Sequence, residues 1–142
     1  MSEWKAIQIG EAEWKEKFSE NFHKLVFKEV KPAFRDRISY ALLVVKAEEA
    51  IGYVTVREMD DENVYWQFGG VIPKFQKSMT AVKCIETAIL WQKEHSKRIT
   101  TYVENTNLPM LRFYLSYGFL VVGTRTYLGH LMVDLIKELH GN

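Results

Sequence analysis

The chain has a single cysteine, Cys84, and no marked excess of charge of either sign. One cysteine cannot build an internal disulfide framework, and this scarcity is typical of proteins in a reducing compartment. No apolar run reaches about 18 residues, the length that a membrane-spanning helix needs. The opening sequence MSEWKAIQIGEAEWKEK has no signal-peptide core. We therefore expect a cytoplasmic protein with no membrane partner.

The balance of charge bears on possible partners. The formal net charge is +1, whereas nucleic-acid-binding domains usually carry a strong basic excess. We therefore expect no nucleic-acid partner. Metal sites need ligands at regular spacings, and we expect none here. The histidines are scattered along the chain, at His23, His95, His130 and His140.

The remaining composition is that of an ordinary globular protein. Hydrophobic residues make up 47% and charged residues 26% of the 142 residues. A chain of this length can bury a core without disulfides or metals. It contains no internal repeat, low-complexity tract or linker. The sequence therefore predicts a single domain spanning residues 1–142.

The spacing of apolar residues predicts an alternation of strands and helices. Trp14, Phe18, Phe22 and Leu25, for example, recur at helical spacing on one face. The expected strands are 4–9, 40–47, 51–57, 64–72, 99–103, 119–126 and 131–136. The expected helices are 11–30, 76–96 and a third that is capped by Thr106 or Asn107 and runs to Tyr117. Turns are expected at Glu48–Glu49 and Gly129, and residues 137–142 are expected to fray. This order indicates an α/β fold with a mixed sheet.

The stretch Val64–Lys83 combines a buried strand, a glycine pair, a proline, a short loop and the start of a long helix. The first N–H groups of a helix lack intrahelical acceptors, and the helix dipole is positive there. A loop that leads into such an end is an anion site. Gly69 and Gly70 indicate a bulge, or a place where another group approaches the backbone closely. The stretch therefore predicts a cradle for a pyrophosphate.

Two motifs connect the chain with a known family. Val71-Ile72-Pro73 precedes the segment Gln76–Ala81, which occupies the place of a pattern R/Q-x-x-G-x-G/A. Further on, Asn107 stands seven residues before Tyr114, which is followed four residues later by Gly118-Phe119. With these motifs the chain resembles the GNAT superfamily of N-acetyltransferases. The resemblance implies a mixed, mostly antiparallel sheet of about six or seven strands flanked by about three or four helices.

The resemblance also implies a site for acetyl-CoA or another acyl-CoA. Gly70, Val71 and Ile72 are the implied cofactor-binding residues at the end of the fourth strand. Backbone groups of this strand near Phe68–Val71 would meet the pantetheine amides as an added strand does. This requires the fourth and fifth strands to separate, and the glycine pair is where a bulge could help. Asn107 would contact the cofactor arm or serve only as a helix cap. The implied pyrophosphate-binding residues are Gln76, Lys77, Ser78, Met79, Thr80 and Ala81, with Lys77 adding a cation.

The chemistry of acyl transfer assigns roles to two further groups. An amine attacks the thioester carbonyl, and the departing thiolate benefits from a nearby acid. Tyr114 is the candidate, because a phenol with a pKa of about 10 stays protonated at neutral pH. Tyr117 competes with it but is expected to be a core aromatic residue. A backbone N–H near Gly70 or Val71 would donate to the developing oxyanion.

The chain departs from the family pattern at three places. Met79 stands where the family has its middle glycine, and Lys77 where glycine is common; the Met79 side chain would crowd the pyrophosphate or pack downward. The fourth strand has Tyr65 and Gln67 but no carboxylate to act as general base. Glu104, at the end of the fifth strand, is the nearest substitute. Glu58 and His130 remain alternatives, and some amines need no dedicated base.

The resemblance implies an N-acetyltransferase. It would transfer an acetyl group from acetyl-CoA to a primary amine of a small molecule or protein, by direct attack in a ternary complex. The alternative is a catalytically weak or inactive binding or regulatory module of the same fold. Met79 and the missing carboxylate would then be signs of lost catalysis. The sequence is compatible with a monomer or a homodimer.

Overall fold

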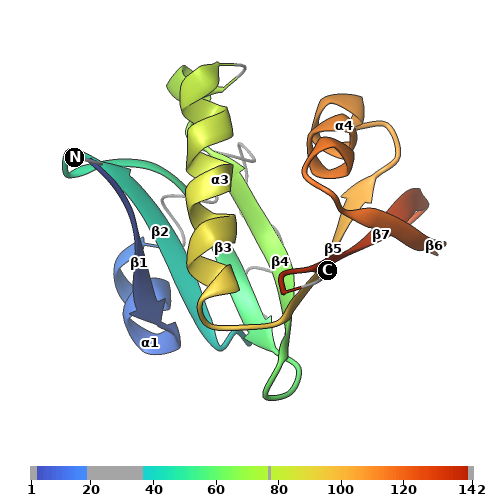
Figure 1. Cartoon of the computed structure of the whole chain (residues 1–142), viewed down its shortest axis with the longest axis horizontal. Helices are drawn as coiled ribbons and strands as arrows, with labels where there is room; N and C mark the ends of the chain where they lie inside the picture. The colour runs from blue at the N-terminus through green and yellow to red at the C-terminus, as the bar shows by residue number, and fades with distance from the viewer. Residues whose placement is uncertain (1–2, 19–36, 77, 141–142) are drawn as a thin grey trace.

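The computed structural model describes residues 3–18, 37–76 and 78–140. The described strands form one seven-stranded sheet in the order β1-β2-β3-β4-β5-β7-β6 (Figure 1). Every neighbouring pair is antiparallel except β4 and β5, which are parallel. The expected mixed, mostly antiparallel α/β fold is therefore confirmed. The strands are β1 (Trp4–Gly10), β2 (Tyr40–Lys46), β3 (Glu49–Glu58), β4 (Asn63–Val71), β5 (Arg98–Glu104), β6 (Leu120–Tyr127) and β7 (His130–Glu138).

Two strand boundaries differ from the prediction by two residues, and the others differ by at most one. The turn between β2 and β3 is formed by Ala47 and Glu48, whose φ angles are 48° and 69°, so Glu49 already belongs to β3. The expected fraying from residue 137 is wrong, because β7 continues to Glu138. There Glu138 pairs with Arg98 of β5, and its carboxylate lies 2.6 Å from the guanidinium.

The helices within the described residues are short apart from one. α1 (Glu11–Glu13) continues directly into the π-helical turn η1 (Trp14–Phe18), and the rest of the helix predicted over 11–30 lies outside the described residues. After β4 come the 3₁₀ turn η3 (Pro73–Phe75) and α3 (Met79–Lys93). α4 (Leu108–Ser116) lies between β5 and β6.

Capping explains where α3 begins and where α4 begins and ends. The predicted start of α3 at Gln76 is wrong, because Ser78 is extended (φ −140°) and its hydroxyl accepts from the Ala81 N–H. α3 also ends at Lys93 rather than at Ser96. α4 begins after the cap Asn107, as predicted. Gly118, with φ of 88°, follows its end in the left-handed conformation that favours glycine.

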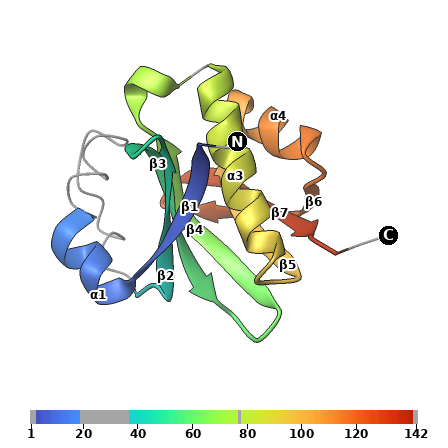
Figure 2. The same cartoon turned by 60° about the vertical axis from the view of Figure 1, so that its left-hand side comes forward.

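The central strands are covered on both faces. α3 and α4 lie on one face of the sheet and α1 lies on the other (Figure 2). Because side chains alternate along a strand, Leu42 and Val44 of β2 pack on the α3 face, while Leu43 and Val45 pack with Trp14 on the opposite face. β2 and β3 therefore form a packed support for β4, which pairs with β3.

The predicted close approach at the glycine pair is confirmed for Gly69. A Cβ atom at this position would lie 2.7 Å from the Tyr53 carbonyl oxygen of β3. The predicted bulge, however, lies just before the pair. The β3–β4 register passes from Val56↔Trp66 to Thr55↔Phe68, which leaves Gln67 as the extra residue.

We predict that Gly69→Ala lowers the free energy of unfolding by about 1–3 kcal/mol, because the added methyl group forces β3 and β4 apart. Urea unfolding measures the change. Gly123→Ala in β6 is the matched control, since nothing lies within 4 Å of its Cβ position. Equal stability of the two variants would contradict the close approach.

Candidate active site

β4 and β5 separate after a short parallel ladder. Only Asn63, Val64 and Tyr65 of β4 pair with β5, opposite Arg98, Ile99 and Thr100. At the next position the Thr101 hydroxyl donates to the Trp66 carbonyl oxygen, at 3.1 Å. A side chain thus satisfies the buried acceptor where the ladder ends. The separation that was predicted for the fourth and fifth strands is confirmed.

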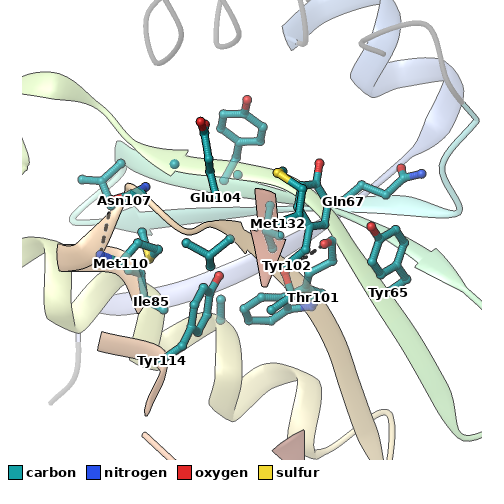
Figure 3. Close-up of a pocket in the computed structure, with 18 of the residues that line it drawn as sticks. Tyr65, Gln67, Ile85, Thr101, Tyr102, Glu104, Asn107, Met110, Tyr114 and Met132 are labelled. Carbon is teal, nitrogen blue, oxygen red and sulfur yellow. Dashed lines mark hydrogen bonds between the residues drawn. The ribbon is translucent and has the colours of Figure 1, made fainter. Parts of the chain in front are cut away.

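The separated strand ends and α4 enclose a cavity of about 790 Å³ (Figure 3). Its size lies within the range of about 300–1,000 Å³ that is common for small-molecule sites. Residues far apart in sequence meet here, from β4, β5, α4 and the β6–β7 hairpin. The cavity brings together residues that the sequence singled out, among them Gly70, Val71, Glu104, Asn107, Tyr114 and His130.

Tyr114 projects from α4 toward the opening between the strands (Figure 3). Its ring packs against Phe119, with 4.7 Å between the ring centroids, and its hydroxyl is hydrogen-bonded to the Thr101 side chain. Burial among these groups raises the pKa of Tyr114 to about 12. The phenol therefore keeps its proton at neutral pH. The competing Tyr117 instead donates its hydroxyl proton to Glu86, at 2.7 Å.

We predict that Tyr114 stays protonated at pH 10.5, where an ordinary tyrosine is largely ionised. Tyrosinate absorbance at this pH should therefore be equal in the wild type and in Tyr114→Phe. The measurement is a spectrophotometric pH titration of both proteins, with circular dichroism to show that they stay folded. One additional tyrosinate in the wild type would show that the pKa is not raised.

The register of β4 determines which backbone groups face the opening. The Ile72 N–H donates to the Ile51 carbonyl oxygen, at 2.8 Å, and this bond fixes the phase of the β3–β4 ladder. Because hydrogen-bonded and non-hydrogen-bonded pairs alternate, the N–H of Gly70 faces Tyr53 in β3, whereas those of Gly69 and Val71 face away from β3. Of the two expected oxyanion donors, the register favours Val71 over Gly70.

The loop after β4 leads to the α3 N-terminus as expected, but its donors are not all available. The Ala81 N–H is capped by Ser78 and the Val82 N–H donates to the Ser78 carbonyl oxygen. The first N–H groups of the helix, those of Met79 and Thr80, have no intrahelical acceptor. Lys77 lies outside the described residues. Gln76 donates its side-chain amide to the Val71 carbonyl oxygen, at 2.8 Å, and thereby joins the loop to β4.

The Met79 side chain does not pack into the protein, since it is 72% exposed. Neither Met79 nor the other described members of the loop and helix start line the cavity itself. They stand beside it at the end of β4, where an anion bound to the helix would be solvent-accessible. The N–H of Ile72, a predicted cofactor-binding residue, is unavailable because it already donates to a carbonyl oxygen of β3.

Asn107 is a helix cap, and it also lies where a ligand in the cavity could reach it. Its side-chain oxygen accepts from the Met110 N–H at 3.4 Å, which caps α4. Asn107 also lines the cavity, as Tyr114 of α4 does (Figure 3). The cap leaves the two amide hydrogens of its side chain able to donate to a ligand.

Two of the three candidate bases meet in the structure. The Glu104 carboxylate lies 2.8 Å from His130 Nδ1, and both residues line the cavity. Glu58 lies at the end of β3 and is not among the residues that line it. A carboxylate paired with an imidazole is a common arrangement for accepting a proton. The geometry therefore favours Glu104 and His130 over Glu58.

Sequence reasoning missed a polar group on the opposite wall. Arg125 of β6 donates to the Tyr65 hydroxyl at 3.2 Å and to Asp134 at 3.0 Å, and its guanidinium lies over the Tyr102 ring. These contacts join β4 to the last hairpin across the opening. The sequence itself carries no sign of them, because Arg125 of β6 reaches β4 across β7 and β5 and the order of these strands is not encoded locally.

Gln67, the bulged residue of β4, also lines the cavity. Its side-chain oxygen is buried and has no hydrogen-bond partner among the residues that the structure describes. Buried polar atoms without a partner are rare in native proteins. The sequence identified Gln67 only as a residue that replaces a carboxylate, and gave no sign that its oxygen would be unpaired.

The described part of the chain gives little support for a metal site, a reactive thiol or a membrane-spanning helix. No group of three or more histidine, cysteine or acidic side chains there could hold a metal ion. Cys84 is buried, which raises the pKa of its thiol to about 12 and keeps it protonated. No described helix has the length and apolar character to cross a membrane.

Comparison with known proteins gives a consistent picture. The profile of the acetyltransferase (GNAT) family matches residues 6–119. A search of curated proteins gives no match. Among solved structures, the chain is similar to a GNAT family acetyltransferase from Elizabethkingia anophelis with acetyl-CoA bound. The TM-score is 0.73 at 16% identity, over 97% of this chain and 99% of that one.

Two further similar structures have different acceptors in their names. One is the ribosomal-protein-S18-alanine N-acetyltransferase from Escherichia coli, with a TM-score of 0.76 and 10% identity over 98% of this chain and 96% of that one. The other shows mutant forms of the spermidine/spermine N-acetyltransferase SpeG from Vibrio cholerae, with a TM-score of 0.71 and 16% identity over 96% and 95%. At these identities the similarity shows the shared fold.

Proposed function

The chain belongs to the acetyltransferase (GNAT) family, and we propose that it transfers an acetyl group from acetyl-CoA to a primary amine. The amine would attack directly in a ternary complex within one acyl-CoA-binding domain, in the cytoplasm. The observation that carries this proposal is that Tyr114 lines the cavity at the opening between β4 and β5, which Val71 also lines with an outward-facing N–H. An acid and an oxyanion donor at one opening suit acyl transfer.

The described residues fit acetyl-CoA in three places. The free N–H groups of Met79 and Thr80 at the α3 N-terminus suit the pyrophosphate, and the exposed Met79 side chain leaves the backbone beside it accessible. The outward-facing edge of β4 at Gly69 and Val71 suits the pantetheine amides. Asn107 donates from the other side of the cavity. When bound, acetyl-CoA supplies an activated acetyl group as a thioester.

Side chains of the protein then donate one proton and accept another. Forming the nitrogen–carbon bond and breaking the carbon–sulfur bond leaves one proton too many on nitrogen and one too few on sulfur. Tyr114 holds the proton that the thiolate takes, because its raised pKa keeps it protonated at every physiological pH. Glu104 and His130, 2.8 Å apart, take the proton from nitrogen directly or through water.

We predict that wild-type protein binds acetyl-CoA in the micromolar range, about −8 kcal/mol, in a calorimetric titration. Tyr114→Phe should bind it equally well, because the change removes only a hydroxyl group, but should lower kcat about 10²-fold or more. The assay measures CoA release with a mixture of small amines and peptides. Binding without turnover would favour a binding or regulatory module of this fold. A loss of binding in Tyr114→Phe with turnover retained would contradict its role as acid.

Substitution of Glu104 tests the proposed base. We predict that Glu104→Gln lowers kcat at neutral pH by about tenfold to a hundredfold, and that the loss shrinks at higher pH, where more of the amine is already neutral. Glu58→Gln is the matched control, since Glu58 lies outside the cavity lining. A pH-rate profile of each variant measures the effect. Equal profiles for the two variants would exclude Glu104.

A further inference from the structure

We propose that the Gln67 side chain binds the amine of the acceptor and selects amines that arrive uncharged. The inference rests on the proposed acetyl transfer and adds to it a class of acceptor. Its basis is that Gln67 lines the cavity and that its buried side-chain oxygen has no hydrogen-bond partner among the described residues.

The local backbone places Gln67 there. The bulge between Trp66 and Phe68 interrupts the β3–β4 ladder at this residue alone. Bulges beside active sites commonly redirect one side chain. Gln67 is 9% exposed, so its carboxamide has little contact with water. A buried acceptor without a donor destabilises the fold, and a ligand that supplies an N–H removes this penalty.

The position of Gln67 separates it from the groups that would hold acetyl-CoA. Trp66 faces α3, where its indole N–H donates to Gln92 at 3.0 Å. Gln67 follows Trp66 and lies on the opposite side of the strand, and Figure 3 shows its side chain directed away from Tyr114. α3 and α4 lie on the face of the sheet that carries Trp66 and that Tyr114 packs against. The opposite face, which carries Gln67, is therefore available to the second substrate.

A neutral carboxamide imposes a condition on that substrate. It accepts an N–H hydrogen bond but provides no charge to compensate for burying an ammonium group. Acceptors whose amine loses its proton readily are therefore favoured. At pH 7 the uncharged fraction of a peptide α-amine (pKa about 7.7–8.0) exceeds that of a lysine side chain (pKa about 10.4) by roughly 10²- to 10³-fold. The inferred acceptor class is an α-amine, such as a peptide N-terminus.

The experiment compares two probes: a peptide with a free N-terminal alanine and no lysine, and the same peptide acetylated at its N-terminus and carrying one lysine. We expect the wild type to favour the first in kcat/KM by at least tenfold at pH 7. Gln67→Glu should reduce this preference about tenfold, because a carboxylate compensates the charge of an ammonium group. Gln67→Leu should raise KM for the first probe about tenfold or more, with acetyl-CoA affinity unchanged.

Stability distinguishes a binding role from a structural one. If Gln67 binds substrate, Gln67→Leu removes an unpaired buried acceptor, and the urea midpoint stays equal or rises. If Gln67 supports the fold, the midpoint falls, and the inference is overturned. Gln8→Leu is the matched control, because Gln8 is exposed on β1 and lies outside the cavity lining.

The outcomes separate this inference from the proposed function. Wild-type turnover of either probe with unchanged KM and preference in both Gln67 variants overturns the role of Gln67 alone. Wild-type binding of acetyl-CoA without turnover of either probe overturns the proposed transfer to such amines, and the role of Gln67 with it. A raised KM in Gln67→Leu, a reduced preference in Gln67→Glu and an undiminished midpoint together support the inference.

Discussion

The end of the β4–β5 ladder after Tyr65 and Thr100 is the constraint on which the rest of the site depends. Parallel strands that separate leave backbone groups exposed on both edges, and such groups need partners. The Thr101 hydroxyl satisfies the Trp66 carbonyl oxygen at this point, so the strands can diverge without leaving that acceptor unpaired. The same hydroxyl meets Tyr114. One threonine therefore links the opening of the sheet to the candidate acid.

The opening has two sides with different chemistry. On the face of α3 and α4 stand the free N–H groups of a helix start, the capped Asn107 and a tyrosine that keeps its proton. On the opposite face lie Gln67 and the Tyr65–Arg125 contact. A reaction between two substrates benefits from such a division, because each can bind to its own set of groups before the reacting atoms meet.

Much of this arrangement was predictable from local sequence. Asn107 and Gly118 mark the ends of α4 through capping and left-handed backbone, and both signals lie within a few residues. Other features depend on distant parts of the chain. Arg125 of β6 reaches Tyr65 of β4 across β7 and β5, and no periodicity encodes this order of strands. The bulge falls at Gln67 rather than at the glycines, because close packing against Tyr53 needs Gly69 in regular register.

In the proposed function the outward-facing edge of β4 receives the acyl donor. Amide hydrogen exchange, followed by NMR with and without acetyl-CoA, measures this contact residue by residue. We expect the N–H of Val71, which faces the opening, to become strongly protected on addition of acetyl-CoA. The N–H of Gly70 faces β3 and should change little. Unchanged exchange at Val71 with saturating acetyl-CoA would show that β4 does not bind the donor.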